Sequence, residues 1–464
     1  MSKYFHLLTD KPALSYKCGE KMVFTVTARE NRTEIACPYI AWTLTGDDGS
    51  KSGGVASCRP GYPFVIETSC ARPGFVHLHC VAKCENSEPD STFDVFDGGA
   101  GAEVESIPYC DEIPSDFDAY WGEIEKTVSE FEPQIAECVQ VGGAPNGFEC
   151  FDVKITTPVD GMVASGYLCK PCSDAKMNIQ INFRGYSVVG AETGYVKDTL
   201  WMSVNAHGIE NGLPKVLTEQ KYKNLAGYGF DRKQNESPYT TYWRNMMIRN
   251  LCAAKWLKSH PQWNKKLFVA AGGSQGALQA VTLAAHDSDV SLLKIQIPWF
   301  CNLAAEKHGY QAGWRPEFAE GLRYFDTAAQ ATRVKCPVKI TAYLGDYTCP
   351  PSTIMALYNN LNVNKSLDFI QGGTHMYRHP DGQKFSLRYD PDNPSGEIKP
   401  GRYRHFKGNE YEVICTALNS ETLSREVVYR ALYGAHDVWV RPADMWNDLV
   451  ECDGCLKRRF EYIG

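Results

Sequence analysis

Ser274 is the residue of this chain whose type and setting most favour covalent chemistry. It stands in a Gly-x-Ser-x-Gly pattern at residues 272–276. A serine hydroxyl becomes a nucleophile when a neighbouring base takes its proton and a carboxylate orients that base. In hydrolases with this motif the chain order is Ser, then Asp or Glu, then His. The motif therefore predicts acyl transfer at Ser274, although alone it also fits a serine in an ordinary glycine turn.

Two residues downstream complete the expected set. Asp346 follows the alternating, β-prone run 338–344, and His375 follows another short strand at 366–370. Functional side chains in α/β sheets lie at the carboxyl ends of strands. Taken singly, Asp346 also fits a turn before two prolines, and His375 a loop histidine without chemistry. As an ordered trio with Ser274 they predict a triad of nucleophile, orienting carboxylate and general base.

A third strand end supplies the expected oxyanion donors. Residues 177–183 predict a strand that leads into Arg-Gly-Tyr at 184–186. In this class of hydrolase a loop at that place donates one backbone N–H to the oxyanion, and the residue after the nucleophile donates the other. We therefore expect the N–H groups of Tyr186 and Gln275 to form the oxyanion hole. A simple turn at Gly185 is the alternative.

The elements around these residues predict an α/β sheet. The apolar run 267–271 predicts a buried strand before Ser274, and residues 277–285 predict a helix after it. Residues 243–260 carry an apolar stripe at helical spacing, which is typical of core packing. Strands that alternate with helices are typical of a parallel sheet. The central part of the chain therefore has the strand–turn–helix context of a nucleophile elbow.

Several motifs in this region occur in a familiar order. They are Arg-Gly-Tyr at 184–186, Gly-Gly-Ser-Gln-Gly at 272–276, Tyr-Phe-Asp at 324–326, Asp-x-x-Cys-Pro-Pro-Ser at 346–352, and His375. Together they resemble the acetyl xylan esterase and cephalosporin C deacetylase family, carbohydrate esterase family 7. Asp-Phe-Asp-Ala-Tyr-Trp at 116–121 resembles the opening of that family's catalytic domain. The resemblance covers about residues 107–380.

The resemblance implies an α/β-hydrolase that removes acetyl groups from acetylated xylo-oligosaccharides and related small esters, without a metal or an organic cofactor. It implies these roles: Ser274 nucleophile, His375 base, Asp346 orienter, and Tyr186 and Gln275 oxyanion donors. Two positions depart from the family pattern. Ala277 replaces a second glycine, and Asn302 stands where an aspartate often follows cysteine, so the polar network around Asn302 is left open.

The polar stretch 188–241 separates the expected oxyanion loop from the next helix. It lacks strong periodicity and contains many Gly, Asn and Tyr residues. Insertions of this size often cover active sites. We predict that it shapes a sugar pocket with aromatic residues such as Tyr228. His207, within it, is expected to structure the loop rather than act as a second base.

Two other functions stay open. A triad does not encode the leaving group, so a peptidase or an acyltransferase on the same fold is the alternative within enzymes. A peptidase would need a charged clamp for a peptide terminus, for which Arg184 is the one candidate. A non-catalytic carbohydrate-binding protein with a decayed hydrolase is the alternative from a different class. The intact Ser-Asp-His set argues against decay.

The composition of the chain limits the kinds of molecule that it is expected to bind. The chain has 464 residues, 43% of them hydrophobic, and a net charge of −7, which argues against nucleic acid as the main partner. No run approaches the ~18–20 apolar residues of a membrane-spanning helix. The first ten residues lack the apolar core of a signal peptide, so a cytoplasmic location is expected. The expected partner is a small acetylated carbohydrate, and the resembled family's tendency to form rings implies a homo-oligomer.

We predict three domains. Residues 1–100 alternate apolar and polar positions between turn clusters, which is typical of an Ig-like β-sandwich, and the small residues 98–102 predict a linker. Residues 107–390 form the α/β-hydrolase catalytic domain.

His77 and His79 share one strand face in the first domain. Such a pair fits a metal site, but partly buried strand histidines are the favoured interpretation.

Residues 398–464 form the third domain. They resemble a small bacterial domain of unknown function through Tyr-x-His-Phe-Lys-Gly at 403–408, Ser-Glu-Thr at 420–422, Val-Val-Tyr at 427–429 and Trp-Val-Arg-Pro at 439–442. We expect a small SH3-like β domain. Its many Arg and aromatic residues suit a sugar, peptide or nucleic acid, and a stabilising or oligomer-forming module is equally compatible.

Eighteen cysteines are many for such a chain. Without a signal peptide they are expected to be reduced, buried and inert. Two Cys-x-x-Cys pairs, Cys169/Cys172 and Cys452/Cys455, offer four thiolates that would suit a structural zinc. The pairs lie far apart along the chain and lack a metal-type knuckle, so no metal site is predicted from them.

Overall fold

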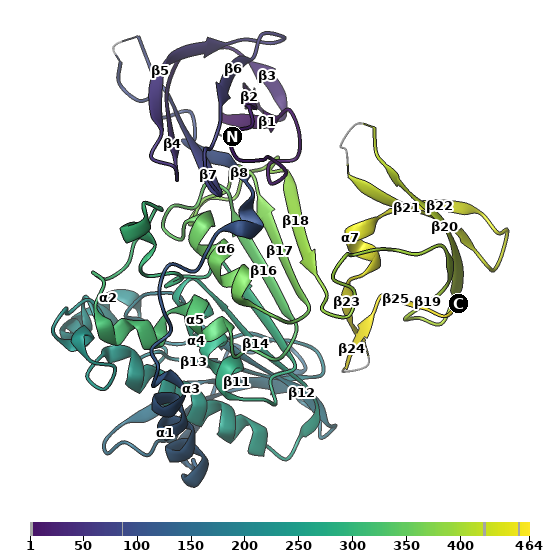
Figure 1. Cartoon of the computed structure of the whole chain (residues 1–464). Coiled ribbons are helices and arrows are strands. Elements are labelled where there is room, and N and C mark those ends of the chain that lie inside the picture. Colours follow the sequence, from purple (N-terminus) through teal and green to yellow (C-terminus); the bar gives the residue numbers. More distant parts are fainter. Residues whose placement is uncertain (1–2, 86, 421–423, 453–454) are drawn as a thin grey trace.

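The computed structural model describes residues 3–85, 87–420, 424–452 and 455–464. A β-rich N-terminal part, a large α/β centre and a small β-rich C-terminal part follow one another along the chain (Figure 1). The C-terminal part lies beside the centre at the β18 edge of its sheet (Figure 1). No helix within the described ranges has the length and apolar character needed to cross a membrane.

The central sheet has ten strands in the order β18-β17-β16-β15-β14-β12-β13-β11-β10-β9. Their bounds are β9 Ile135–Val141, β10 Phe148–Thr156, β11 Val163–Pro171, β12 Met177–Phe183, β13 Thr199–Val204, β14 Trp263–Gly273, β15 Leu292–Gln296, β16 Val338–Tyr343, β17 Lys365–Ile370 and β18 Lys384–Tyr389. The strands from β13 to β17 in this order pair in parallel, while β18 and the β11-β10-β9 end pair antiparallel. The expected parallel sheet is therefore confirmed, with antiparallel additions at both edges.

One layer of helices covers this sheet. Its members are α1 Phe117–Glu130, α3 Tyr242–Ser259, α4 Gln275–His286, α5 Thr327–Ala331 and α6 Pro351–Asn360, and the short α2 Lys215–Lys221 lies in the insertion. Consecutive members of the layer contact one another, and α4 packs on β12, β14 and β15. Strand β12 shows the consequence, since Ile179 and Ile181 are buried while Gln180 and Asn182 on the opposite face are only half-buried. The alternation matches one apolar and one polar sheet face.

The C-terminal part covers a piece of the second sheet face. Its hairpin of β23 Leu449–Cys452 and β24 Cys455–Arg458 contacts β14. Leu456 packs against Leu267, Val269 and Leu292 on that face. An ion pair between Lys294 and Glu451 adds to the contact. Apolar burial therefore joins the C-terminal part to the sheet.

The N-terminal part consists of two four-stranded antiparallel sheets, as a sandwich requires. One holds β1 Tyr4–Thr9, β2 Met22–Glu30, β3 Thr33–Ile35 and β6 Phe64–Thr68; the other holds β4 Cys37–Gly46, β5 Lys51–Cys58, β7 Gly74–Ala82 and β8 Phe96–Ala102. The prediction of a linker at 98–102 is wrong, because these residues belong to β8. A Cβ on Gly99 would lie 1.9 Å from the Val76 carbonyl oxygen. The glycine therefore allows close strand packing rather than flexibility.

The C-terminal part folds around a core of its own. Its antiparallel sheet has the order β22-β21-β20-β19-β25, with bounds β19 Gly401–His405, β20 Glu410–Leu418, β21 Arg425–Ala431, β22 Val438–Pro442 and β25 Phe460–Tyr462. Trp446 in α7, Ala443–Trp446, stacks on Phe460 with ring centroids 3.7 Å apart. The expected β domain is confirmed, and its SH3-like closure stays a prediction. The Ser-Glu-Thr element at 420–422 falls largely outside the described residues.

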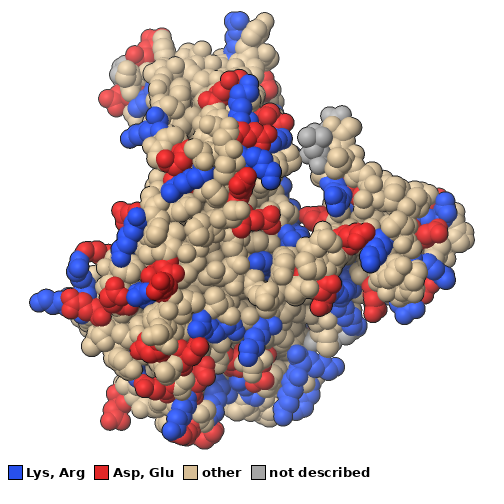
Figure 2. Space-filling model, in the orientation of Figure 1, with Lys and Arg blue, Asp and Glu red and all other residues tan. Residues whose placement is uncertain are grey.

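All cysteines are free, and ten of the eighteen are buried. Cys415, which lies in β20, is exposed, contrary to the expectation of burial. Cys169 faces Cys150 across β10 and β11, with the two sulfurs 2.8 Å apart, rather than joining Cys172 in a metal site. On the molecular surface, positive and negative side chains intermingle over the face seen in Figure 2.

Candidate active site

Ser274 lies on a sharp, strained turn between β14 and α4. Its backbone has φ 54° and ψ −122°, which a non-glycine residue adopts only when the surrounding structure imposes it. A Cβ on Gly272 would lie 2.2 Å from the Gly276 carbonyl oxygen. One on Gly276 would lie 2.1 Å from the Phe183 carbonyl oxygen at the end of β12. The glycines of the motif are therefore required by backbone contacts, and the strand–turn–helix context is confirmed.

Asp346 and His375 form a hydrogen-bonded pair at the ends of β16 and β17. The His375 Nδ1 atom lies 2.9 Å from Asp346 Oδ2. The Asp346 side chain is fully buried, and its Oδ1 accepts the backbone N–H groups of Thr348 and Cys349, each at 2.9 Å. A carboxylate bound in this way keeps one orientation and directs the histidine ring. The structure thus brings these two predicted residues together.

Cys349 connects this pair to Ser274. The Ser274 side chain lies close enough to the Cys349 thiol to lower its pKa slightly. The Cys349 sulfur also lies within 4.8 Å of side-chain ligand atoms of Asp346 and His375. Burial raises the pKa of the Cys349 thiol well above its ordinary value, so the thiol is neutral. Sequence reasoning missed this contact, although the cysteine belongs to the Asp-x-x-Cys-Pro-Pro-Ser motif.

The two expected oxyanion donors border Ser274. A Cβ on Gly185 would lie 3.7 Å from Ser274 Cβ, so the loop that carries Tyr186 runs directly beside the serine. Gln275 is the first residue of α4, where a backbone N–H has no acceptor within the helix. The helix N-terminus also favours negative charge. Both N–H groups therefore belong to the immediate surroundings of the Ser274 hydroxyl.

Tyr228 ties the oxyanion loop to the elbow. Its hydroxyl accepts a hydrogen bond from the Gln275 side chain at 2.8 Å and one from the Ser187 N–H at 3.3 Å. Its carbonyl accepts the Tyr186 hydroxyl at 2.9 Å, and the two rings stack at 4.2 Å. Tyr228 is buried, at 6% exposure. It therefore positions the loop, and its burial differs from the prediction that it lines a sugar pocket.

Replacing Tyr228 by phenylalanine should lower kcat about tenfold with little change in KM. The change removes the acceptor of two hydrogen bonds that hold the oxyanion loop, and about 1.4 kcal/mol in the barrier corresponds to tenfold in rate. Steady-state kinetics on an acetyl ester would measure it. The matched control is Tyr242→Phe, because the Tyr242 hydroxyl binds His207 instead. Equal effects of both changes on kcat would contradict the positioning role.

His207 structures the insertion, as predicted. Its Nδ1 lies 2.6 Å from the Tyr242 hydroxyl and its Nε2 2.9 Å from the Ser187 carbonyl oxygen. Burial lowers the pKa of His207 to about 4. The ring is therefore neutral at pH 7 and supports the segment that follows the oxyanion loop.

His207 should make the protein less stable in acid. Its folded pKa lies below the unfolded value of 6.5, so the unfolded chain takes up the proton first and stability is lost as the pH falls from about 6.5 to about 4. The loss should approach 3 kcal/mol, at about 1.4 kcal/mol for each pKa unit. Denaturant unfolding at pH 7 and pH 4.5 would measure it. His207→Asn should flatten this dependence, and an unchanged slope would contradict the assignment.

Several aromatic side chains lie close to the turn that carries Ser274. The Trp314 ring meets Tyr186 edge-on at 4.8 Å and lies 5.5 Å from Trp299 in a stacked arrangement. The backbone N–H of Trp299 donates to the Ser274 carbonyl oxygen at 3.3 Å. Trp314 is 45% exposed. It thus offers a solvent-exposed aromatic surface near Ser274.

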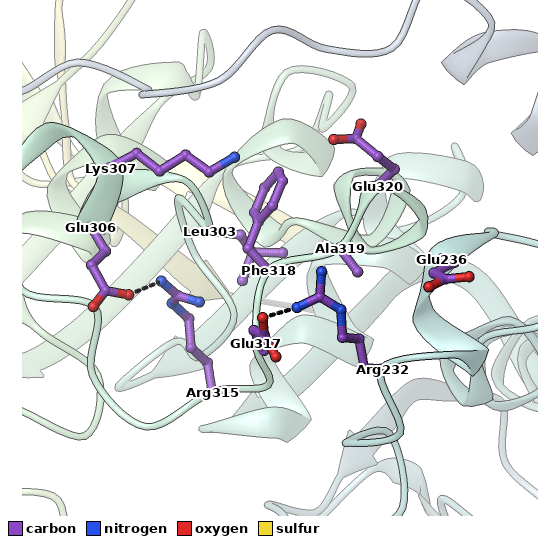
Figure 3. Close-up of a pocket in the computed structure, with 10 residues that line it drawn as sticks. All are labelled: Arg232, Glu236, Leu303, Glu306, Lys307, Arg315, Glu317, Phe318, Ala319 and Glu320. Atoms are coloured by element: carbon purple, nitrogen blue, oxygen red, sulfur yellow. Dashed lines mark hydrogen bonds and ion pairs between the residues drawn. The ribbon is translucent and has the colours of Figure 1, made fainter.

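A charged cavity of about 570 Å³ includes Arg315, the residue that follows Trp314, in its lining (Figure 3). It is lined by Arg232, Glu236, Leu303, Glu306, Lys307, Arg315, Glu317, Phe318, Ala319 and Glu320. Ser274, Asp346 and His375 are not among these residues. The charged side chains pair with one another, Arg315 with Glu306 at 3.0 Å and Arg232 with Glu317 (Figure 3). Ser274, Asp346 and His375 thus do not line this cavity.

The two departures from the family pattern lie in packed surroundings. Ala277 is fully buried in α4. The Asn302 side chain accepts the Cys110 N–H at 2.8 Å and donates to the Pro108 carbonyl oxygen at 3.1 Å. Its own N–H donates to Asp326. Asn302 therefore anchors the segment before α1.

Arg184, the candidate peptide clamp, pairs with Glu192 at 2.6 Å. Its guanidinium is thus already matched by a carboxylate. This arrangement disfavours a role in binding the terminal carboxylate of a peptide.

Two clusters within the described ranges have side chains close enough to hold a metal ion. One consists of Asp346, Cys349 and His375, in which the thiol is neutral. The other consists of His77, His79 and Asp97 in the N-terminal part. The second cluster confirms that the two histidines share one strand face.

The family described as Acetyl xylan esterase (AXE1) matches residues 103–307 and 314–389, and the family described as Protein of unknown function (DUF1653) matches residues 401–462. The Acetyl esterase Axe7A of Xylanibacter ruminicola is 26% identical over 285 residues, which are 54% of this chain and 61% of that protein. The chain thus spans less than two thirds of the length of this curated relative.

Among solved structures, acetyl xylan esterase 1 from Thermoanaerobacterium sp. JW/SL YS485 is 21% identical and covers 60% of this chain and 94% of its own, with a TM-score of 0.49. A DUF1653 protein from Bordetella bronchiseptica is 34% identical and covers 15% of this chain and 90% of its own, with a TM-score of 0.14.

Proposed function

Because this chain belongs to the acetyl xylan esterase family, we propose that it is a serine esterase that removes acetyl groups from acetylated xylo-oligosaccharides and related small sugar esters. The family is one of α/β-hydrolases that cleave carboxylic esters, which confirms the predicted fold class and enzyme class. The observation that carries the proposal is the strained turn at Ser274, together with the buried Asp346 that is hydrogen-bonded to the partly exposed His375. A cytoplasmic location and a homo-oligomeric state stay predictions.

The proposed reaction has two steps. His375 takes the proton of the Ser274 hydroxyl as its oxygen attacks the acetyl carbonyl. The N–H groups of Tyr186 and Gln275 stabilise the negative oxygen of the tetrahedral intermediate. His375 then gives the proton to the sugar oxygen, which leaves as an alcohol, and water hydrolyses the acetyl-enzyme by the same route. Asp346 keeps the histidine in the productive tautomer.

Trp314 is the proposed contact for the sugar. A pyranose ring presents C–H faces that pack well on an aromatic surface, and Trp314 is the exposed member of the aromatic group beside Ser274. A Cβ on Gly313 would lie 2.4 Å from the Thr348 carbonyl oxygen, so the Trp314 segment is held against the loop that carries Asp346. The position of the indole ring relative to the triad is therefore defined by packing.

Replacing Trp314 by alanine should raise KM for an acetylated xylo-oligosaccharide about tenfold, the equivalent of about 1.4 kcal/mol of lost contact. The values of kcat/KM for p-nitrophenyl acetate should change much less, because that ester has no sugar ring. Parallel kinetics on both substrates would measure the difference. The same loss on both substrates would show that the tryptophan supports the fold and does not recognise the sugar.

The proposal is tested by acetate release. The full chain should release acetate from acetylated xylo-oligosaccharides faster than it hydrolyses longer-chain esters of the same sugars. It should leave peptide amides intact, because Arg184 is engaged by Glu192. Cleavage of a peptide panel without acetate release would replace the proposal by the peptidase alternative. Binding of xylan without turnover of any ester would favour a carbohydrate-binding protein.

A further inference from the structure

Three side chains with metal-binding atoms converge on one face of the N-terminal part. His77 and His79 occupy alternate positions of β7, and Asp97 stands opposite His79 on the neighbouring β8. The Asp97 Oδ1 atom lies 2.7 Å from His77 Nε2 and 2.8 Å from His79 Nδ1. Two imidazole nitrogens thus converge on one carboxylate oxygen.

We propose that His77, His79 and Asp97 bind one divalent transition-metal ion, with zinc as the class that best suits the ligands. Zinc accepts imidazole nitrogen and carboxylate oxygen, and three protein ligands leave a fourth position for water. The ligand atoms of the cluster all lie within 4.8 Å of one another. Around a tetrahedral ion with bonds of about 2.0–2.1 Å they would stand roughly 3.3 Å apart. Binding of the ion would therefore replace both hydrogen bonds of Asp97 and require its carboxylate oxygen to withdraw from the two imidazole nitrogens.

The exposure of the three side chains suits a binding site. It is 16% for His77, 39% for His79 and 19% for Asp97. The cluster is thus open to solvent on the His79 side, which provides access for the ion and for a water ligand. The rest of the cluster is enclosed, which keeps the ligand atoms together.

The strands that carry these residues are held by the catalytic part. A Cβ on Gly345 would lie 2.1 Å from the Asp97 carbonyl oxygen, so β8 runs against the loop before Asp346. The Gln371 side chain accepts the Gly99 N–H at 2.9 Å and donates to the Gly99 carbonyl oxygen at 2.7 Å. These contacts fix the backbone that carries the ligands, much as residues around known metal sites hold the ligands in position.

The ring of His77 connects the cluster to the loop that carries Asp346. It stacks on Tyr347 with ring centroids 3.7 Å apart and an angle of 19°. Tyr347 directly follows Asp346 in the chain. A metal ion at this place would therefore stabilise the junction of the N-terminal and catalytic parts. The ester reaction proposed above does not need it.

The test measures metal binding by the full chain and is independent of esterase activity. After removal of metals with a chelator and incubation with zinc, one zinc ion per chain should remain bound through gel filtration, as measured by elemental analysis. Cobalt(II) should give visible absorption bands with the intensity of a four-coordinate site. Zinc should raise the melting temperature of the wild-type protein.

Asp97→Asn keeps the hydrogen-bonding shape but removes the anionic ligand, and it should weaken zinc binding at least about tenfold. His77→Gln with His79→Gln should abolish binding and the cobalt bands. Cys172→Ser with Cys455→Ser is the matched control, because it removes thiols of both Cys-x-x-Cys pairs and should change nothing. Unaltered zinc content in the histidine variant, or loss of zinc only in the thiol variant, would overturn the proposal. So would a wild-type chain that binds no zinc.

Discussion

Ser274→Ala should abolish acetate release while the chain keeps its fold. The variant lacks the oxygen that would bond to the acetyl carbon, and loss of a serine nucleophile of this kind costs on the order of 10⁶ in kcat. Alanine fits the turn, because it keeps the serine Cβ and removes only the hydroxyl oxygen. Acetate release, measured beside the circular-dichroism spectrum, would report both properties.

The matched control is Ser187→Ala on the oxyanion loop. The Ser187 hydroxyl makes only a 3.4 Å contact to the Gly185 carbonyl oxygen, whereas its backbone N–H and carbonyl bind Tyr228 and His207 and stay in place. This variant should retain near wild-type activity. Appreciable turnover by Ser274→Ala with a native spectrum would refute the assignment of the nucleophile.

Asp346→Asn should lower kcat by about 10⁴ with a small change in KM. An amide in place of the Oδ2 atom would present an N–H to His375 Nδ1, which forces the proton onto the nitrogen that must act as base. The Thr348 and Cys349 N–H groups would still find an acceptor at Oδ1, so the loop should keep its shape. Kinetics on an acetyl ester, together with thermal unfolding, would separate the two effects.

Asp326→Asn is the matched control, because Asp326 is a second buried carboxylate in the same family motifs. It accepts the N–H groups of Asn302, Leu303 and Ala328 and does not contact the triad. The change should lower the free energy of unfolding by about 1–3 kcal/mol, since a buried donor loses its acceptor. The values of kcat should change little. A kcat loss in this variant as large as that in Asp346→Asn would argue against a specific role for Asp346.

Much of the active site could be predicted without a structure. The spacing of Gly272, Ser274 and Gly276 determines a turn that admits no other side chains, and the contacts of these glycines with nearby carbonyl groups give the reason. Strand periodicity located the ends of β12, β16 and β17 within one or two residues. These properties are local, because backbone sterics and alternation act between neighbours in the chain. Family resemblance then supplied the roles that remain to be tested.

Tertiary structure decided where distant residues meet. The sequence places Cys349 and Tyr228 far from Ser274, and only the packed fold puts a thiol beside the serine and a tyrosine hydroxyl between Gln275 and Ser187. The same holds for Asp97, which strand pairing brings to His77 and His79. Small residues at 98–102 looked like a linker because their composition alone cannot distinguish flexibility from close packing. Local patterns specify torsion angles and buried faces, whereas the partner that each face meets depends on the whole chain.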